Sequence, residues 1–125
     1  MMLHTDFYQA AARALAGVTV GGQPAPLKLW LFGDAPADPG GAYATYQAIG
    51  PGGRRWVFEG AADYARLQIN ISGLKSDPAC MAKIGAAYAA LDGLPKVKRL
   101  GPPLPLPGAA GDPYKTLRAD YEVTL

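Results

Sequence analysis

The chain has 125 residues, half of them hydrophobic, and carries twelve basic against ten acidic side chains. This length fits a single domain spanning 1–125, because two cores would each be too small to fold alone. The near balance of charge excludes a dedicated nucleic-acid binder, and no apolar run approaches the ~18 residues of a membrane span. The N-terminus lacks the basic and apolar blocks of a signal peptide, so we expect a protein made in a cytoplasm.

The first half of the chain predicts one helix followed by two strands. Residues 7–16 are rich in alanine, Thr5 or Asp6 can cap this helix, and Gly17 ends it. A loop over 21–26 precedes a short apolar strand over 27–32. Residues 33–41 contain too much Gly and Pro for either element, and 42–49 form the next strand. After a turn at 50–55, residues 56–58 can extend a hairpin.

Residues 64–92 are the stretch around which the rest is organised. Residues 64–72 alternate between apolar and polar side chains, which predicts a strand with one buried face. That face carries Ala65, Leu67, Ile69 and Ile71.

A turn over 73–76 then leads to a second helix, with Asp77 as N-cap and Pro78 at its first position. Gly93 supplies the stop. Four residues at helical spacing form its apolar stripe: Met81, Ile84, Tyr88 and Leu91.

The C-terminal third predicts two more strands. Residues 97–100 form a brief edge strand, and 101–113 are extended and non-helical because they are rich in proline. Residues 115–125 alternate again, with an inward face of Leu117, Ala119, Tyr121, Val123 and Leu125. The element order predicts an α+β fold: a mainly antiparallel sheet of four to five strands with two helices packed on one face.

Residues with catalytic or metal-binding chemistry are few. The only histidine, His4, lies near the N-terminus, and the only serines are Ser72 and Ser76. Cys80, the only cysteine, excludes an internal disulfide and a cysteine-based zinc site, and it is better explained as a small buried residue than as a nucleophile. Asp34 and Asp38 flank a Pro-rich turn, where aspartate usually makes turn hydrogen bonds. We therefore expect no catalytic residue, no metal and no cofactor.

Three features could instead form a binding surface. The first combines charge and aromatic rings at a turn, as interfaces do, although its rings could equally fold into the core: Arg54, Arg55, Trp56 and Phe58. The second is a basic cluster of Lys96, Lys98 and Arg99, which could touch phosphate but more commonly is a solvated face. The third is a stiff proline-rich arm, Pro102, Pro103, Leu104, Pro105, Leu106 and Pro107. With Arg99 the arm matches an SH3 ligand pattern that arises easily by chance; an arm laid on a neighbouring subunit is the better interpretation.

Residues 29–36 read LWLFGDAP and residues 43–50 read YATYQAIG. With the alternating strand, the helix and the closing strand that follow, they resemble the phage tail-terminator (tail-completion) proteins of long-tailed bacteriophages and related gene transfer agents. The resemblance covers the whole chain in element order.

This resemblance implies a structural virion protein that assembles as a ring, typically hexameric, on the head-proximal end of the tail tube. Such a ring stops tube growth and offers a surface to the head-closure or neck proteins. DNA passes through it without sequence-specific binding, which agrees with the weak net charge. Two alternatives stay open: another ring component of the particle, such as a neck adaptor or tail-tube subunit, and a small cytoplasmic ligand-binding module.

Overall fold

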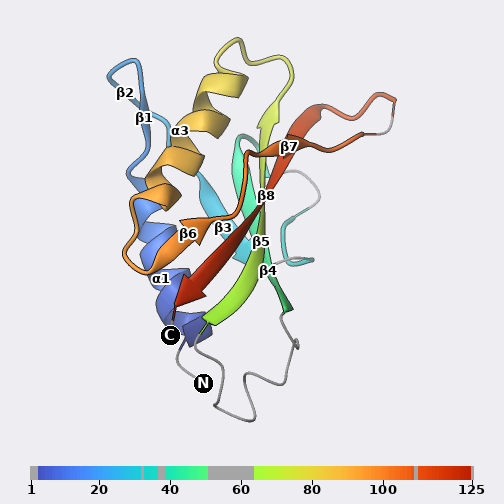
Figure 1. Ribbon diagram of the computed structural model, residues 1–125. Coiled ribbons are helices and arrows are strands. Elements are labelled where there is room, and N and C mark those ends of the chain that lie inside the picture. The colour runs from blue at the N-terminus through green and yellow to red at the C-terminus, as the bar shows by residue number, and fades with distance from the viewer. Residues whose placement is uncertain (1–2, 32, 37–38, 51–63, 109, 125) are drawn as a thin grey trace.

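The computed structural model describes the whole chain except residues 1–2, 32, 37–38, 51–63, 109 and 125 (Figure 1). Two helices and eight strands lie in the described part. In chain order they are α1 (Leu3–Ala16), β1 (Thr19–Val20), β2 (Gln23–Pro24), β3 (Lys28–Leu31), β4 (Tyr43–Gly50), β5 (Tyr64–Leu74), α3 (Cys80–Asp92), β6 (Val97–Arg99), β7 (Leu104–Pro105) and β8 (Tyr114–Thr124).

The larger sheet contains six strands in the order β3-β4-β5-β8-β6, with β7 also paired to β8. All its neighbours are antiparallel except β3 and β4, which run parallel. The architecture is therefore α+β with a mixed sheet, and the predicted count of four to five strands is wrong. The additional strand is β7, whose two residues are too few to show the alternation by which a strand is recognised in a sequence.

The two long central strands supply the core face of this sheet. Ile69 pairs with Ala119 and Ile71 with Leu117, so the apolar positions of β5 and β8 share one face. Ile69 and Ile71 are completely buried, and each contributes roughly 1.5–3 kcal/mol through removal of its side chain from water. The predicted inward face of both strands is confirmed wherever burial is described: Leu67, Ile69, Ile71, Leu117, Ala119, Tyr121 and Val123.

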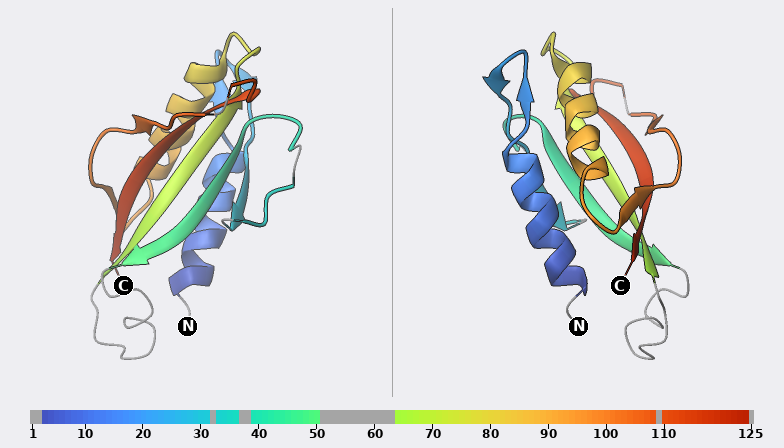
Figure 2. Two further views of the ribbon diagram at one scale, coloured as in Figure 1. Left: turned by 90° about the vertical axis from the view of Figure 1, so that its right-hand side faces the viewer. Right: turned by 60° about the vertical axis from the view of Figure 1, so that its left-hand side comes forward.

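Both helices lie on the same side of the large sheet (Figure 2). Helix α1 buries Phe7, Ala11 and Leu15, which recur every four residues and so form one stripe. The ring of Phe7 packs 5.9 Å from that of Tyr46 on β4. We name the opposite side of the sheet, which neither helix covers, the open face.

The helix starts differ from the sequence prediction. Helix α1 begins at Leu3, so Thr5 and Asp6 lie inside it rather than before it. Helix α3 begins at Cys80, after a turn in which the Asp77 carboxylate accepts a 2.9 Å hydrogen bond from the backbone N–H of Ala79. Asp77 thus bonds a free N–H as an N-cap would, although it lies two residues before the N-cap position, Ala79.

The apolar stripe of α3 contains three of its four predicted residues, Ile84, Tyr88 and Leu91. Its buried residues are Cys80, Ile84, Ala87, Tyr88 and Leu91, whereas Met81 is 50% exposed. The expectation for Met81 is wrong. Helical spacing allows either Cys80 or Met81 to be the first buried residue of the stripe, and the orientation in which α3 packs on the sheet buries Cys80. Gly93 follows the helix with φ −81°, so it ends α3 without the left-handed conformation expected of a glycine stop.

Two expected loops are part of strands. The predicted loop over 21–26 contains the turn and the second strand of a small hairpin, β1–β2, whose turn residues Gly21 and Gly22 have φ of 60° and 79°. Both turn positions of such a two-residue hairpin need positive φ, which glycine adopts without strain. The predicted turn over 73–76 starts later, because β5 continues through Gly73 to Leu74.

Candidate interaction surface

The proline-rich arm, residues 102–107, lies along the edge of its own sheet. Leu104 pairs with Arg118 and Pro105 with Leu117, and the backbone N–H of Leu106 donates a 2.9 Å hydrogen bond to the carbonyl of Thr116. Segment 101–108 is non-helical, as its prolines predict. Proline is tolerated here because an edge strand leaves one side of its backbone unpaired.

The arm presents apolar side chains outward. Leu104 is 55% exposed, and Leu100, just before the arm, is 41% exposed. Pro103 and Leu106 are half-buried, while Pro102, Pro105 and Pro107 are exposed. The arm is thus held in place by β8 while most of its surface stays available for contact.

Two depressions border the arm. The first, which we name the groove, holds about 290 Å³ on the helix side between α3, β6 and the arm. Its lining is mainly apolar and includes Met81, Ile84, Tyr88, Pro103 and Leu117. The second, the hollow, holds about 280 Å³ and is lined by Arg66, Leu100, Gly101, Pro102, Leu104, Arg118, Ala119 and Asp120.

The floor of the groove rests on two buried tyrosines. The Tyr88 hydroxyl lies 2.9 Å from the carbonyl oxygens of both Ile69 and Leu117, so its single proton is shared between β5 and β8. The Tyr121 hydroxyl donates to the Asp92 carboxylate at 2.9 Å. Burial is the main cause that raises the pKa of both hydroxyls, so both stay protonated as donors. These contacts join α3 to the sheet and provide no base or nucleophile.

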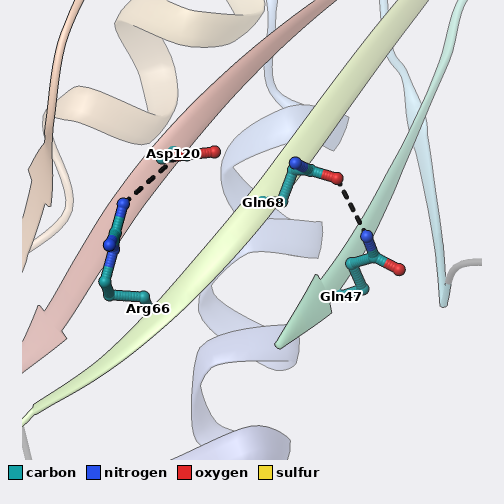
Figure 3. Close-up of polar contacts among 4 residues, drawn as sticks. All are labelled: Gln47, Arg66, Gln68 and Asp120. Atoms are coloured by element: carbon teal, nitrogen blue, oxygen red, sulfur yellow. Dashed lines mark hydrogen bonds and ion pairs between the residues drawn. The ribbon is translucent and has the colours of Figure 1, made fainter. Parts of the chain in front are cut away.

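The open face is polar and hydrogen-bonded (Figure 3). The Gln47 side-chain amide donates to the Gln68 carbonyl oxygen at 2.8 Å, linking β4 to β5. Arg66 on β5 reaches Asp120 on β8 at 3.4 Å, a long and partly exposed ion pair. Such a pair contributes little to stability, so Arg66 is weakly held in its present position.

The basic cluster divides between two faces. Arg99 turns to the helix side and pairs with Asp92 at 3.2 Å, while Lys98 is exposed and lies opposite Glu122 of β8. Lys96 lies before β6 with φ 63°. Because successive strand residues point to opposite faces, these three side chains do not converge into one basic patch.

The residues considered for chemistry are placed as follows. Cys80 is buried, and burial is the largest of the causes that raise the pKa of its thiol. The hydroxyl of Ser72 lies 2.6 Å from that of Thr116. Asp34 is exposed and its backbone N–H closes a turn on Leu31. Within the described residues, no three His, Cys, Asp or Glu side chains gather as a metal site.

Some predicted positions lie outside what the structure describes. Arg54, Arg55, Trp56 and Phe58 all fall in the segment 51–63, and Asp38 falls in 37–38. The side chain of His4 is likewise outside the description. Of the predicted interface residues, the structure therefore brings together only those of the arm.

The sequence reasoning missed Arg66, Arg118 and Asp120, which meet in the hollow. Each appears in the sequence only as one polar position of an alternating strand. An antiparallel pairing of β5 with β8, assumed from the sequence, would have identified them. Any register that buries the apolar faces of both strands also places these polar residues together on the opposite face of the sheet.

Within the described chain, neither helix has the length and apolar character of a membrane-crossing segment. No protein-family model matches the sequence, and no curated protein matches it.

Proposed function

We propose that this protein is a structural subunit of a ring, hexameric in the resembled family, that closes the head-proximal end of a phage-type tail tube. The proposal rests on the likeness of residues 29–36 and 43–50, and of the element order, to tail-terminator proteins. The ring ends tube polymerisation and presents a surface to the head-closure or neck proteins. It belongs to the virion and catalyses no reaction.

One structural observation supports an assembly role in particular. Three of the five large apolar side chains that are exposed in the described residues, Met81, Leu100 and Leu104, lie around the arm. A subunit that must stay soluble until tubes are complete cannot carry a large permanent hydrophobic patch. A few separate apolar anchors on and beside a stiff segment meet that requirement, because proline leaves little entropy to lose on binding.

The contact surface that we propose combines the arm and the groove with the segment that the sequence predicts as a turn, which lies outside the described residues and carries Arg54, Arg55, Trp56 and Phe58. The arm supplies the apolar anchors to a neighbouring subunit or to the tube end. The turn supplies charge and aromatic rings, the residue types most enriched at interface hot spots.

The test replaces Met81 and Leu104 together with glutamate. Both are at least half exposed, so the subunit should stay folded, with a change in stability within about 0.5 kcal/mol per site. Rings on tube ends should be lost, and a complementation assay should give tails of uncontrolled length that fail to join heads. The control is Gln9→Glu with Arg13→Gln, which makes the same total charge change at exposed positions of α1.

Three results would contradict the proposal. If the double glutamate variant supports normal infectious particles, the arm and groove are not the contact surface. If the unchanged protein never binds purified tube ends under electron microscopy, the terminator function itself is wrong. Rings that form within the tube or on isolated heads would identify a different ring component of the particle.

A further inference from the structure

The hollow beside the arm has more positive than negative charge, although the open face as a whole is mixed. Arg66 and Arg118 supply two guanidinium groups to its lining, and Asp120 supplies the only carboxylate among the lining residues. Among the described residues, the Asp120 carboxylate pairs only with Arg66, at 3.4 Å. Two positive groups against one negative leave an excess of one positive charge in a depression of about 280 Å³.

Within the part of the chain that the structure describes, Arg118 has no partner for its guanidinium. No hydrogen bond or ion pair joins its side chain to any residue that the structure describes, although the side chain is half-buried. Asn70, directly opposite in the β5–β8 register, does not bond it, and the Asn70 side-chain oxygen is itself buried without a partner. Five guanidinium donors are therefore left to solvent or to a ligand.

Arg66 is also incompletely bonded. Its Nε is buried and makes no hydrogen bond, and its single ion pair with Asp120 is long. Buried donors without a partner are rare in folded proteins, because each loses its hydration without replacement. A second acceptor entering the hollow would let Arg66 and Arg118 complete their bonding from neighbouring strands.

The rim identifies the kind of ligand. Leu100, Leu104 and Pro102 border the two arginines, and the first two are among the most exposed large apolar residues of the described chain. Apolar surface beside a guanidinium suits a polypeptide better than a nucleic-acid backbone, which is bound by basic side chains with little apolar contact.

We propose that the hollow is a binding site for a carboxylate of another polypeptide, an Asp or Glu side chain flanked by an apolar residue. The carboxylate bonds Arg118 and shares Arg66 with Asp120, and the apolar neighbour packs on Leu100 and Leu104. Guanidinium–carboxylate bonds are the strongest that such a site can make, because both groups are charged and their geometry permits two parallel bonds. This inference does not rest on the ring, since it concerns the chemistry of one depression.

The probe is the blocked dipeptide N-acetyl-Leu-Glu-amide, titrated into the ¹⁵N-labelled full chain while the Arg Nε–H signals are followed by NMR. Saturable shifts of the Arg66 and Arg118 signals are expected with this probe. The matched dipeptide N-acetyl-Leu-Gln-amide, which has the same shape without the charge, should produce none at equal concentration. This comparison needs no variant and so is independent of any folding defect.

Variants then locate the site. Arg118→Gln should weaken binding by roughly tenfold, because it removes a charged donor pair. Arg13→Gln, at an exposed position of α1, should leave binding unchanged. Equal shifts with both dipeptides, or no saturable shift with either, would overturn the proposal. Tighter binding of inorganic phosphate than of the glutamate probe would also overturn it, since the site would then be selective for phosphate.

Discussion

Tyr88 bonds both central strands of the sheet through its hydroxyl group. It is 2% exposed and reaches carbonyl oxygens on β5 and β8 from the middle of α3. Its ring also stacks near that of Tyr121, with 6.4 Å between centroids. One side chain thus connects the helix to the two central strands through both apolar packing and hydrogen bonding.

Tyr88→Phe should lower the free energy of unfolding by about 1–3 kcal/mol, because it removes the hydroxyl proton while leaving buried carbonyls with one bond fewer. Chemical denaturation of the purified protein measures this. Tyr8→Phe, at a position that is 38% exposed, is the control and should change stability by less than about 0.5 kcal/mol. Equal losses in the two variants would show that the Tyr88 hydroxyl does not contribute through these bonds.

Gly73 illustrates how one residue permits a close contact between elements. A Cβ built on it would lie 2.8 Å from the Cys80 Sγ, below normal van der Waals distance. The glycine is therefore required by the approach of α3 to β5, which explains why it lies inside a strand rather than in the turn that the sequence suggests.

Gly73→Ala should destabilise the protein by about 1–3 kcal/mol through overpacking. Cys80→Ala removes the clashing sulfur, so the double variant should be more stable than the sum of the two single changes predicts. Thermal unfolding of all four proteins gives the coupling. Strict additivity would mean that the sulfur is not the group that excludes a side chain at position 73.

At the scale of elements, the start of α3 depends on one carboxylate. Asp77 accepts a 2.6 Å bond from the Lys83 ammonium and a 2.9 Å bond from the Ala79 N–H, and these bonds lower the pKa of Asp77 from its usual 3.8. Because the pKa of Asp77 is lower in the folded protein than in the unfolded chain, its carboxylate stabilises the folded protein at pH values above the unfolded-state pKa. This stabilisation is lost as the pH falls through the folded-state pKa.

Asp77→Asn should therefore flatten the pH dependence of stability in the acid range. Near neutral pH the variant should be less stable than the unchanged protein, and the difference should shrink below pH about 4, where the carboxylate becomes protonated. Denaturation midpoints at a series of pH values measure this, with Asp34→Asn, at an exposed turn, as the control. A difference that stays constant with pH would show that charge is not the origin.

For the molecule as a whole, the main organising feature is the difference between the two faces of the large sheet. One face carries the buried apolar residues of β5 and β8 and lies on the helices, while the other, which neither helix covers, carries polar side chains such as Gln68 and Asp120 (Figures 2 and 3). Ile69 and Gln68 are neighbours on β5 whose side chains lie on opposite faces of the sheet. Comparing substitutions at these two positions therefore shows which face packs in the core.

Ile69→Ala should cost about 2–5 kcal/mol, because the deleted carbons leave a cavity in a fully buried site. Gln68→Ala removes one partly buried hydrogen bond with Gln47 and should cost no more than about 1 kcal/mol. Calorimetric unfolding of both variants tests the assignment. Similar small losses would mean that the register of the sheet is wrong.

The sequence by itself determined the features that depend on local periodicity. Alternation in β5 and β8 predicts their length closely and their buried face correctly, since a one-residue shift in register would expose every apolar side chain. The alanine-rich α1 and the strand β6 follow from composition and turn residues in the same way. Each of these predictions depends only on the residues within one short segment of the chain.

Only the tertiary structure decided the features that depend on how distant segments meet. The parallel pairing of β3 with β4, the docking of β7 on β8 and the exposure of Met81 all depend on the packing of elements against one another. The hollow has the same origin, because Arg66 and Arg118 lie 52 positions apart and meet only when β5 and β8 pair. Local sequence preferences are weak compared with burial in a shared core, so such contacts cannot be deduced from spacing alone.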